Sequence, residues 1–538
     1  MAKFERPPQV DTDLLDLGDR RVHHAQRIAV SKKGMIATQH YRATEAGQEI
    51  FEQGGNAFDA AVAAAFALGV CEPAASGLGG QTMTLLRHAD SGRTLALDGS
   101  SRAPNRATPQ LLSKLERRRG HQATTVPSTP AVLDYVLARY GRLKLRQVLQ
   151  PAIRLAEEGY LISMLHYALT RRELKHLKGG SAASFYLRDG AKLYAVGSKF
   201  QQPVLAETLR RLAQKGVKDF YTGQIAQQIH DDMARHDGLL HKDDLAQIPR
   251  PIERRPITYR FESLRLFTMP PPAAGRTLIE MLNIFSKLPE RYRNFDTPHG
   301  AAALAETIRR AFLDRQDRPF DPNFFPQIAG ERMLSDEYAQ LVARQIAKRV
   351  RSQGETTHLS AMDHEGNVVS LTQSIERVYG ACAVTPELGF LYNNYLSAFE
   401  YEDIAHPHYL RPNAVPWASV APTIVMRGRK PWLSIGSPSS ERITSSIFQV
   451  IIRLLRQSPW AAVDAPRLHC SLKGVVSLES TRMRSDIPLM LKRRGFELDA
   501  RDPYSFYLGC VQMVLREGEE LIGVADPRRD GSAGGPKA

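Results

Sequence analysis

The stretch Gly354-Glu355-Thr356-Thr357-His358-Leu359-Ser360-Ala361-Met362-Asp363, near the middle of the 538-residue chain, decides how the fold is interpreted. Residues 356–362 have the composition of a β-strand that begins at a threonine. A threonine hydroxyl is a weak nucleophile inside a chain, but at a chain terminus the α-amine of the same residue can take up its proton. Thr356 can reach that state only if the chain is cleaved between Glu355 and Thr356, which would leave fragments 1–355 and 356–538.

The residues after this strand are typical of a β-hairpin. Asp363-His364-Glu365-Gly366-Asn367 predicts a tight turn, and residues 368–375 predict the returning strand. Gly366 suits the position of a three-residue loop that requires a positive φ. Pairing Asp363 with Asn367 then places Thr356 opposite Ser374, a second hydroxyl. For this segment alone, a surface hairpin whose threonines only favour β-structure is the alternative interpretation.

Other segments along the chain indicate a family. They are, in order, GGNAFDAAVA at residues 54–63, Glu72-Pro73 with Ser76-Gly77-Leu78-Gly79-Gly80, MPPPAAG at 269–275, APTIV at 421–425, Gly436-Ser437-Pro438 and ADPR at 525–528. Together with the segment at Thr356, they resemble γ-glutamyltransferases, a family of N-terminal-nucleophile hydrolases. The resemblance covers nearly the whole chain, from about residue 34 to about residue 530.

This resemblance implies an α+β fold, a four-layer αββα sandwich in which two stacked antiparallel sheets are flanked by helices. Fragments 1–355 and 356–538 would be the large and small subunits after self-cleavage, and together they would form one structural domain. A heterodimer of the two fragments is therefore expected, and a dimer of heterodimers is also compatible. Long helical segments and antiparallel strand patterns in one chain agree with this class.

The resemblance also implies catalytic roles. Thr356 Oγ would attack an amide carbonyl, and water or an amine would resolve the resulting acyl-enzyme. The backbone N–H groups of Ser439 and Ser440, which follow Gly436-Ser437-Pro438, would stabilise the oxyanion. The family has a glycine pair there, and because serine adopts a positive φ poorly, this role depends on the local backbone. Ser374 replaces the family's second threonine beside the nucleophile.

The candidate substrate pocket departs from the family at most contacts to an amino-acid head group. Ser100 takes the position of the family's carboxylate-binding arginine, and Arg102 lies two residues later. Ala418-Ser419 replaces a serine pair that also binds the carboxylate. Arg102 is the residue that could restore a carboxylate clamp, so a rebuilt glutamyl pocket is an open alternative.

The remaining departures affect the amine side of the head group. Glu376 replaces an asparagine that holds the α-amine, while Tyr395 and Ala398 replace a glutamine and an aspartate. Losing a buried charge partner can cost about 2–5 kcal/mol in binding, so we expect poor use of glutathione. The connection 399–416 is shorter than in family members with a lid, which predicts an open cleft and favours hydrolysis over transfer.

Composition limits the partners that this chain can have. Its net charge of +15 comes from scattered basic clusters such as Arg117-Arg118-Arg119, which lack interleaved aromatic residues. We therefore expect solvated helix faces and no nucleic-acid partner. The longest apolar stretch, residues 57–70, is too short to cross a bilayer, and residues 1–8 lack the apolar run of a secretion signal. The sequence thus predicts a cytoplasmic protein without a membrane partner.

No metal or other cofactor is expected. The four cysteines, Cys71, Cys382, Cys470 and Cys510, are widely spaced and are predicted to be free, buried thiols. The histidines form no HExxH motif or tight cluster. His358 is expected to be structural or solvent-facing, because the α-amine of Thr356 already supplies a base.

Less informative regions are predicted from composition. Residues 1–33 predict a loose polar arm, residues 130–235 a mainly helical region, and residues 531–538 a Gly/Ser/Ala tail. Residues 336–353 predict a helix and an exposed linker, where new chain ends could lie.

Three functions stay open from the sequence. The preferred one is an amidohydrolase with an acyl group other than γ-glutamyl, such as an acyl side chain or a small carboxylate amide like oxamate. The second is a γ-glutamyl hydrolase or transferase that uses Arg102 and Glu376 for glutathione or related compounds. The third is an inactive, uncleaved relative that acts as a binding protein. A small-molecule amide is the expected substrate of the first two.

Overall fold

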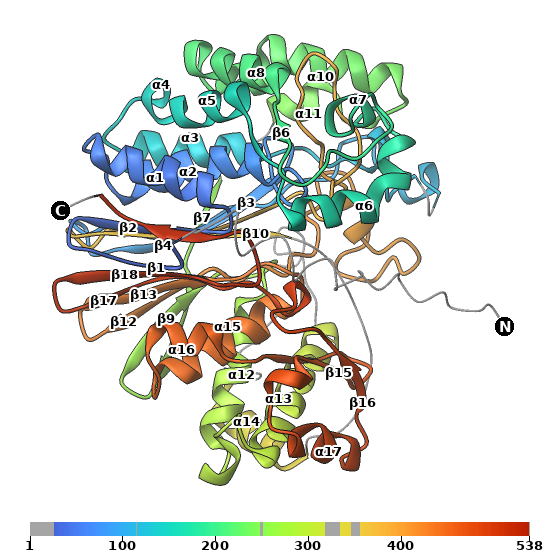
Figure 1. Cartoon of the computed structure of the whole chain (residues 1–538). Helices are drawn as coiled ribbons and strands as arrows, with labels where there is room; N and C mark the ends of the chain where they lie inside the picture. The colour runs from blue at the N-terminus through green and yellow to red at the C-terminus, as the bar shows by residue number, and fades with distance from the viewer. Residues whose placement is uncertain (1–25, 114–115, 248–250, 318–333, 346–355, 537–538) are drawn as a thin grey trace.

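Two seven-stranded antiparallel sheets lie face to face between layers of helices (Figure 1). The computed structural model describes residues 26–113, 116–247, 251–317, 334–345 and 356–536. Apolar side chains from the facing sides of both sheets form part of one hydrophobic core, which continues into the lower helices. A second core lies between the upper sheet and its helices. The predicted αββα sandwich is therefore confirmed.

The upper sheet holds the hairpin that follows Thr356. Its strands, in spatial order, are β19 (Ser532–Gly534), β2 (Gly34–Thr38), β10 (Thr357–Asp363), β11 (Val368–Ser374), β3 (Gln81–Arg87), β4 (Thr94–Gly99) and β7 (Ile252–Arg254). Strands β10 and β11 lie near its centre and are buried along their whole length. The first residues of β10 pair with β11, and from Leu359 onward β10 also pairs with β2.

The lower sheet combines strands from distant parts of the chain. Their order is β1 (Ile28–Ser31), β18 (Glu520–Ala525), β17 (Gln512–Glu517), β13 (Lys430–Gly436), β12 (Thr423–Arg427), β9 (Leu264–Thr268) and β8 (Ile257–Phe261). Both sheets thus take strands from either side of the Glu355–Thr356 bond. Neither part of the chain could form these sheets alone.

The β10–β11 hairpin has the predicted register. Met362 pairs with Val368, and the Asp363 N–H donates to the Asn367 carbonyl over 3.1 Å. Gly366 has the required positive φ of 96°. The Asp363 carboxylate accepts from the N–H groups of Gly366 and Asn367, and also from Ala57 N over 3.0 Å. The turn is therefore tied to the first residue of helix α2.

Helix α2 (Ala57–Cys71) is buried on all sides, as its alanine-rich sequence predicts. Asn56 caps it by accepting from the N–H groups of Phe58 and Asp59, while Asp59 Oδ2 accepts from Asn56 N over 2.8 Å. The rest of the upper helical layer comprises α1 (Tyr41–Glu52), α3 (Thr129–Tyr140), α4 (Leu145–Val148), α5 (Gln150–Glu158), α6 (Met164–Lys178), α7 (Ala183–Tyr186), α8 (Pro203–Lys215), α9 (Lys218–Thr222), α10 (Gln224–Arg235) and α11 (Lys242–Ala246). The two-stranded sheet of β5 (Tyr160–Leu161) and β6 (Lys199–Phe200) accompanies them.

The lower helical layer covers the other face of the sandwich (Figure 1). It comprises α12 (Gly275–Lys287), α13 (Pro298–Asp317), α14 (Asp336–Gln345), α15 (Arg442–Leu454), α16 (Pro459–Asp464) and α17 (Asp486–Arg493). A small sheet of β14 (Leu468–Cys470), β15 (Val475–Leu478) and β16 (Glu497–Ala500) lies beside them. Helix α15 follows β13 after the short connection 437–441.

Several expectations about the chain ends were wrong. Residues 28–31 of the predicted polar arm form the edge strand β1, and residues 532–534 of the predicted tail form β19, paired with β2. Both segments gain order by completing sheet edges, which their composition does not reveal.

The Arg117–Arg119 cluster lies in turns instead of on a helix. The predicted linker falls at 346–355, outside the described residues.

Two compositional expectations can be compared with the structure. All four cysteines are free and buried, as predicted. Within the part of the chain that is described, none of the helices combines the length and apolar character needed to cross a bilayer.

Candidate functional site

Thr356 lies immediately before β10, at the edge of the interface between the sheets. Thr357 pairs with Gln373, so one further step along each strand sets Thr356 opposite Ser374, as the hairpin register predicts. Side chains alternate along a strand, which puts Thr356 on the same face as His358, toward the lower sheet. Thr356 is buried, with 5% of its surface exposed. The start of β10 is thus enclosed by both sheets.

His358 has a structural position. Its ring nitrogens contact Thr372 Oγ1 at 2.9 Å and Ser360 Oγ at 3.1 Å. Burial lowers the pKa of His358 to about 3, so the ring is neutral at pH 7. The ring also lies against Gly436, where an added Cβ would be 2.1 Å from the imidazole Cε1. The solvent-facing alternative for His358 is therefore wrong, and the structural one is confirmed.

Ser374 belongs to a row of polar side chains across the upper sheet. It pairs with Gln81, the first residue of β3, and its Oγ accepts from Glu376 N over 2.9 Å. Tyr395, at the start of the 3₁₀ turn Tyr395–Ala398, hydrogen-bonds to both Ser374 and Gln81. Tyr395 is buried, which raises the pKa of its hydroxyl well above its usual range. The structure thus brings Thr356, Ser374 and Tyr395 together.

Ser439 and Ser440 form a strained turn between β13 and α15. Their φ angles are 85° and 51°, in the left-handed region that glycine prefers. Each non-glycine residue held in such a region costs about 1–3 kcal/mol, and such strain is common at functional sites. The turn directly precedes the N-terminus of α15, whose dipole favours negative charge nearby. The backbone conformation expected of a glycine pair is therefore kept although both residues are serines.

A buried arginine connects this turn to the strand that carries the candidate nucleophile. Arg529 Nη2 donates to Ser439 Oγ over 3.0 Å, and Arg529 Nη1 lies 3.4 Å from Glu72 Oε1. Glu72 Oε2 accepts from Thr357 Oγ1 over 2.5 Å. Burial raises the pKa of Glu72 to about 7, against the opposing effects of Arg529 and the Thr357 hydroxyl. The contacts therefore run from Ser439 to the residue after Thr356.

Ser100 and Arg102 have partners of their own. Ser100 N and Oγ donate to Asp98 Oδ1 over 3.0 and 2.5 Å, and Asp98 Oδ2 accepts from Arg254 over 2.6 Å. Arg102 Nη1 donates to Asn413 Oδ1 over 3.1 Å, and the Arg102 side chain is half-buried. Both side chains are therefore engaged by neighbouring residues.

Glu376 and Ser419 border the site on the more exposed side. Glu376 has a φ of 74° and lies two residues after the end of β11. Burial raises the pKa of Glu376 to about 7, with Arg377 opposing the shift. Ser419 is half-buried, and the carbonyl of its neighbour Ala418 accepts from Arg315 over 2.5 Å. A carboxyl group that titrates near neutrality therefore lies two residues from Ser374.

The open cleft stays a prediction, while the side chains around Thr356 are buried. Thr356, Ser374, Tyr395 and Ser439 are at most 5% exposed. The connection 399–416 packs against the segment that follows Ser100, where Ala103 N donates to the Ala414 carbonyl over 2.9 Å. Apolar residues from both segments form a separate small core. Apolar residues at both ends of the connection therefore pack against the segment that follows Ser100.

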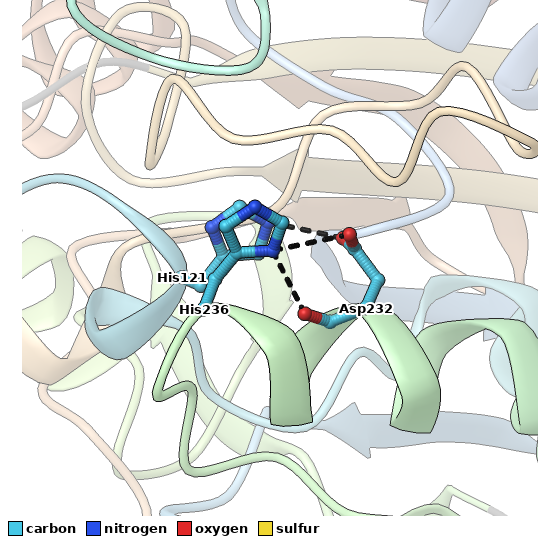
Figure 2. A group of neighbouring side chains, drawn as sticks. All are labelled: His121, Asp232 and His236. Carbon is cyan, nitrogen blue, oxygen red and sulfur yellow. Dashed lines mark hydrogen bonds and ion pairs between the residues drawn. The ribbon is translucent and has the colours of Figure 1, made fainter.

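Figure 2 shows the one group of described residues that has the composition of a metal site. Asp232 Oδ2 lies 3.0 Å from His121 Nε2, and Asp232 Oδ1 lies 3.2 Å from His236 Nδ1. The two imidazoles are stacked, with ring centroids 4.3 Å apart and planes inclined by 8°. A ring nitrogen offers its lone pair in the plane of the ring, so two stacked rings cannot both direct lone pairs at one ion. The arrangement suits two histidines that share a carboxylate, and Thr385 Oγ1 donates to the same group over 2.8 Å.

Sequence reasoning missed several residues of the site. Glu72 lies in a recognised motif but received no role, and Arg529 follows the ADPR segment directly. Gln81 carried no signal beyond its strand position. Arg119 was interpreted as part of a solvated basic face, yet it donates to the carbonyls of Val378 and Gly380 in the loop after Ser374. Only the two motif positions could have drawn attention to these contacts.

Comparison with known proteins places this geometry among characterised relatives. The family model described as Gamma-glutamyltranspeptidase matches residues 43–535. A glutathione hydrolase proenzyme from Escherichia coli K12 is 30% identical over 93% of this chain and 91% of that protein. Acylase ACY 1 proenzyme from Pseudomonas sp. strain V22 is 32% identical over 94% of each chain. The crystal structure of cephalosporin acylase from Bacillus halodurans superposes with a TM-score of 0.88 at 28% identity, over 97% of this chain and 99% of that one.

Proposed function

Because this chain belongs to the gamma-glutamyltranspeptidase family, we propose that it is an amidohydrolase that cleaves its own Glu355–Thr356 bond and then uses Thr356 Oγ as nucleophile. The supporting observation is the position of Thr356 beside Ser374 and on the face of β10 that is directed toward the lower sheet. The proenzyme names of the E. coli and Pseudomonas relatives agree with a chain that matures by cleavage. The products would be fragments 1–355 and 356–538, held together by the shared sheets as a heterodimer.

Self-cleavage begins from the intact peptide bond. Thr356 Oγ attacks the carbonyl carbon of Glu355, its proton passes to the departing Thr356 nitrogen, and the C–N bond breaks. This leaves an ester between Glu355 and the Thr356 hydroxyl and frees the α-amine. Water then hydrolyses the ester, which gives a carboxylate on Glu355 and restores the hydroxyl. The α-amine needed for the next reaction therefore arises from this one.

Substrate hydrolysis repeats the same bond changes on an external amide. The α-amine of Thr356 accepts the hydroxyl proton as Oγ bonds to the substrate carbonyl carbon. The proton is passed to the leaving nitrogen, the amine departs, and an acyl ester remains on Thr356. Water, deprotonated by the same α-amine, attacks the ester carbon, and the acid product leaves. We assign the N–H groups of Ser439 and Ser440 to the oxyanion in both steps.

For the acyl group, we propose a substrate without the α-amino acid head group. Ser100 is occupied by Asp98, and Tyr395 fills the position beside Ser374 with a neutral aromatic side chain. The similarity to two proteins named acylases supports this choice. Burial of an ammonium or carboxylate without partners is costly, so a site with few charged contacts selects a neutral acyl chain or one bearing a single carboxylate.

Two observations favour a second candidate, a γ-glutamyl hydrolase or transferase. Arg102, which donates to the Asn413 amide, is a cation that could also bind a carboxylate, and Glu376 lies two residues beyond Ser374, where it could accept an ammonium group. The E. coli relative named glutathione hydrolase is similar over as much of the chain as the acylase. An uncleaved binding protein is the remaining alternative, and it predicts a single inactive polypeptide.

A single set of measurements separates these functions. Purified wild type and Thr356→Ala are analysed by mass spectrometry, which should show a fragment starting at Thr356 only in the wild type. Hydrolysis is then measured with p-nitroanilides of γ-glutamate, glutarate and butyrate. The γ-glutamyl compound carries an α-amine and a carboxylate, the glutaryl compound carries only the carboxylate, and the butyryl compound carries neither. Faster turnover of the glutaryl or butyryl compound supports our proposal. Preference for the γ-glutamyl compound supports the second candidate, and an active wild type that stays one chain would refute the mechanism.

A further inference from the structure

We propose that Arg529 is a positioning residue for the proposed reaction, and that it acts by holding the Ser439 hydroxyl and, through Glu72, the residue after Thr356. This inference rests on the proposed function, since it assigns the Ser439–Ser440 turn to the oxyanion. It goes further by naming the group that aligns this turn with the nucleophile.

The Ser439–Ser440 turn needs contacts from outside the turn to keep its conformation. Ser439 and Ser440 are two consecutive residues with φ angles of 85° and 51°, a conformation that isolated serines rarely keep. Side-chain contacts supply the hold at Ser439, whose Oγ donates to the Phe506 carbonyl over 3.3 Å and accepts from Arg529 Nη2 over 3.0 Å. A glycine pair could adopt the backbone more easily but would offer no hydroxyl. Ser439 therefore has a strained backbone conformation, and the contacts of its own hydroxyl hold that conformation in place.

The same guanidinium reaches the strand of the candidate nucleophile. Its Nη1 lies 3.4 Å from Glu72 Oε1, and the other oxygen of Glu72 accepts from Thr357 Oγ1 over 2.5 Å. The Gln39 amide is oriented so that each of its contacts joins a donor to an acceptor. Its nitrogen donates to Thr357 Oγ1 and Glu72 Oε1 over 3.1 and 3.2 Å. Its oxygen accepts from His358 N over 3.2 Å. One buried charge thus contacts both the Ser439–Ser440 turn, which follows β13 of the lower sheet, and Glu72, which binds the first residue of β10 in the upper sheet.

The segment that carries Arg529 is itself fixed. Arg27 Nη1 donates to the carbonyls of Arg529 and Gly531 over 2.6 and 2.7 Å. Arg528, the preceding residue, is fully buried and donates to both oxygens of Glu479 over 2.8 and 2.7 Å. Arg529 is only 3% exposed. Because its segment is fixed, the Arg529 guanidinium can hold the turn and Thr357 at a constant distance. Lysine would offer one donor group instead of a planar fork.

The expected effect is on the chemical step more than on substrate binding. If Arg529 aligns the oxyanion donors, its loss should misplace them in the transition state, and a displacement of about 1 Å can cost about 10²-fold in rate. Arg529→Met should therefore lower kcat by about 10²-fold with KM changed less than about threefold. Arg529→Lys should recover only part of this loss.

Ser439 provides the decisive variant. Ser439→Gly relieves the backbone strain and removes the hydroxyl, so the proposal expects Tm to stay equal or rise while kcat falls by about tenfold or more. The effects of Ser439→Ala and Arg529→Met should not add in the double variant, because each breaks the same contact. The substrate is whichever p-nitroanilide of the three above the wild type hydrolyses fastest, and self-cleavage of each variant is followed by mass spectrometry.

A control and the opposing outcomes complete the test. Arg453→Met removes another buried arginine, bidentate to Asp296 at 2.9 and 2.8 Å, and should lower Tm while leaving kcat unchanged. Wild-type kcat in Ser439→Gly, or additive losses in the double variant, would overturn the proposal while the proposed function stands. If Arg529→Met fails to fold, the two Ser439 variants and Arg529→Lys still decide. A wild type that neither cleaves itself nor hydrolyses any of the three compounds defeats the proposed function itself.

Discussion

The imidazole of His358 lies so close to Gly436 that any side chain at position 436 would overlap it, since an added Cβ would be 2.1 Å from Cε1. His358 is two residues after the candidate nucleophile, and Gly436 is three residues before Ser439. The two residues come from facing sheets, so their contact sets the separation between the start of β10 and the Ser439–Ser440 turn. Several consequences of this arrangement can be measured.

Gly436→Ala should damage both stability and self-cleavage. The new methyl group must displace the His358 ring, which is buried and hydrogen-bonded to Thr372 and Ser360. Overpacking of this kind costs about 1–3 kcal/mol, and it should move the start of β10 away from the turn. Thermal unfolding and the fraction of cleaved chain by mass spectrometry measure the two effects.

The matched control is Gly179→Ala, where the nearest atoms would be 3.7 Å from the added Cβ. This variant should resemble the wild type in both measurements. Normal cleavage and Tm in Gly436→Ala would show that the two sheets are not held at a fixed separation by this contact.

Ser374→Ala should slow self-cleavage, substrate turnover or both. The variant loses the hydroxyl that faces Thr356, accepts from Glu376 N over 2.9 Å and hydrogen-bonds to Tyr395. Losing a buried acceptor costs about 1–3 kcal/mol, so rates should fall by about tenfold or more. Ser374→Thr keeps the hydroxyl and should be tolerated. Rates equal to wild type in the alanine variant would count against the role assigned to Ser374.

Arg102→Ala tests substrate specificity. If the enzyme prefers acyl groups without an α-amino acid head group, the variant should hydrolyse the butyryl compound at close to the wild-type kcat/KM. Any loss should be confined to substrates that carry a carboxylate, because only these can pair with the half-buried Arg102 guanidinium. Efficient γ-glutamyl hydrolysis in the wild type that is lost in Arg102→Ala would establish the γ-glutamyl alternative. Without compensating contacts, the departures in the head-group pocket should lower kcat/KM for a γ-glutamyl substrate by well over tenfold.

Acid should destabilise the protein below about pH 6.5 through buried histidines. Burial lowers the pKa of His358 to about 3 and those of His166 and His408 to about 4. The unfolded chain binds these protons from about pH 6.5 downward, whereas the folded chain does not until lower pH. The stability that neutral histidines provide is therefore present above pH 6.5 and is lost as pH falls toward about 3–4, by about 2 kcal/mol for each group at pH 5.

Thermal unfolding at pH 7.5 and pH 5 measures this dependence. His408→Gln removes one of the three groups and should narrow the Tm difference between the two pH values, even if both Tm values fall. His364→Gln changes an exposed ring in the hairpin turn and serves as the control. An unchanged difference in His408→Gln would mean that this histidine does not contribute to the acid sensitivity.

Local features of the sequence predicted the central hairpin correctly. Gly366 specified the turn, the Asp363–Asn367 pairing specified the register, and Asn56 with Asp59 specified the start of α2. These predictions succeeded because hairpin register and helix capping depend on residues that are close in sequence. The family and its sandwich fold were also recognisable, because their motifs are spread along almost the whole chain.

Other features depend on contacts between residues that are distant in sequence. Residues 28–31 and 532–534 become strands only because sheet edges formed elsewhere accept their hydrogen bonds. The positive φ of Ser439 contradicts the preference of serine, and it is compatible with the fold because Arg529, 90 residues away, holds the side chain. Thr356 and Ser374 were paired by sequence alone, whereas their position relative to the Ser439–Ser440 turn was decided by the packing of two sheets. Local preferences set each strand and turn, but long-range packing determined which of them meet at the site.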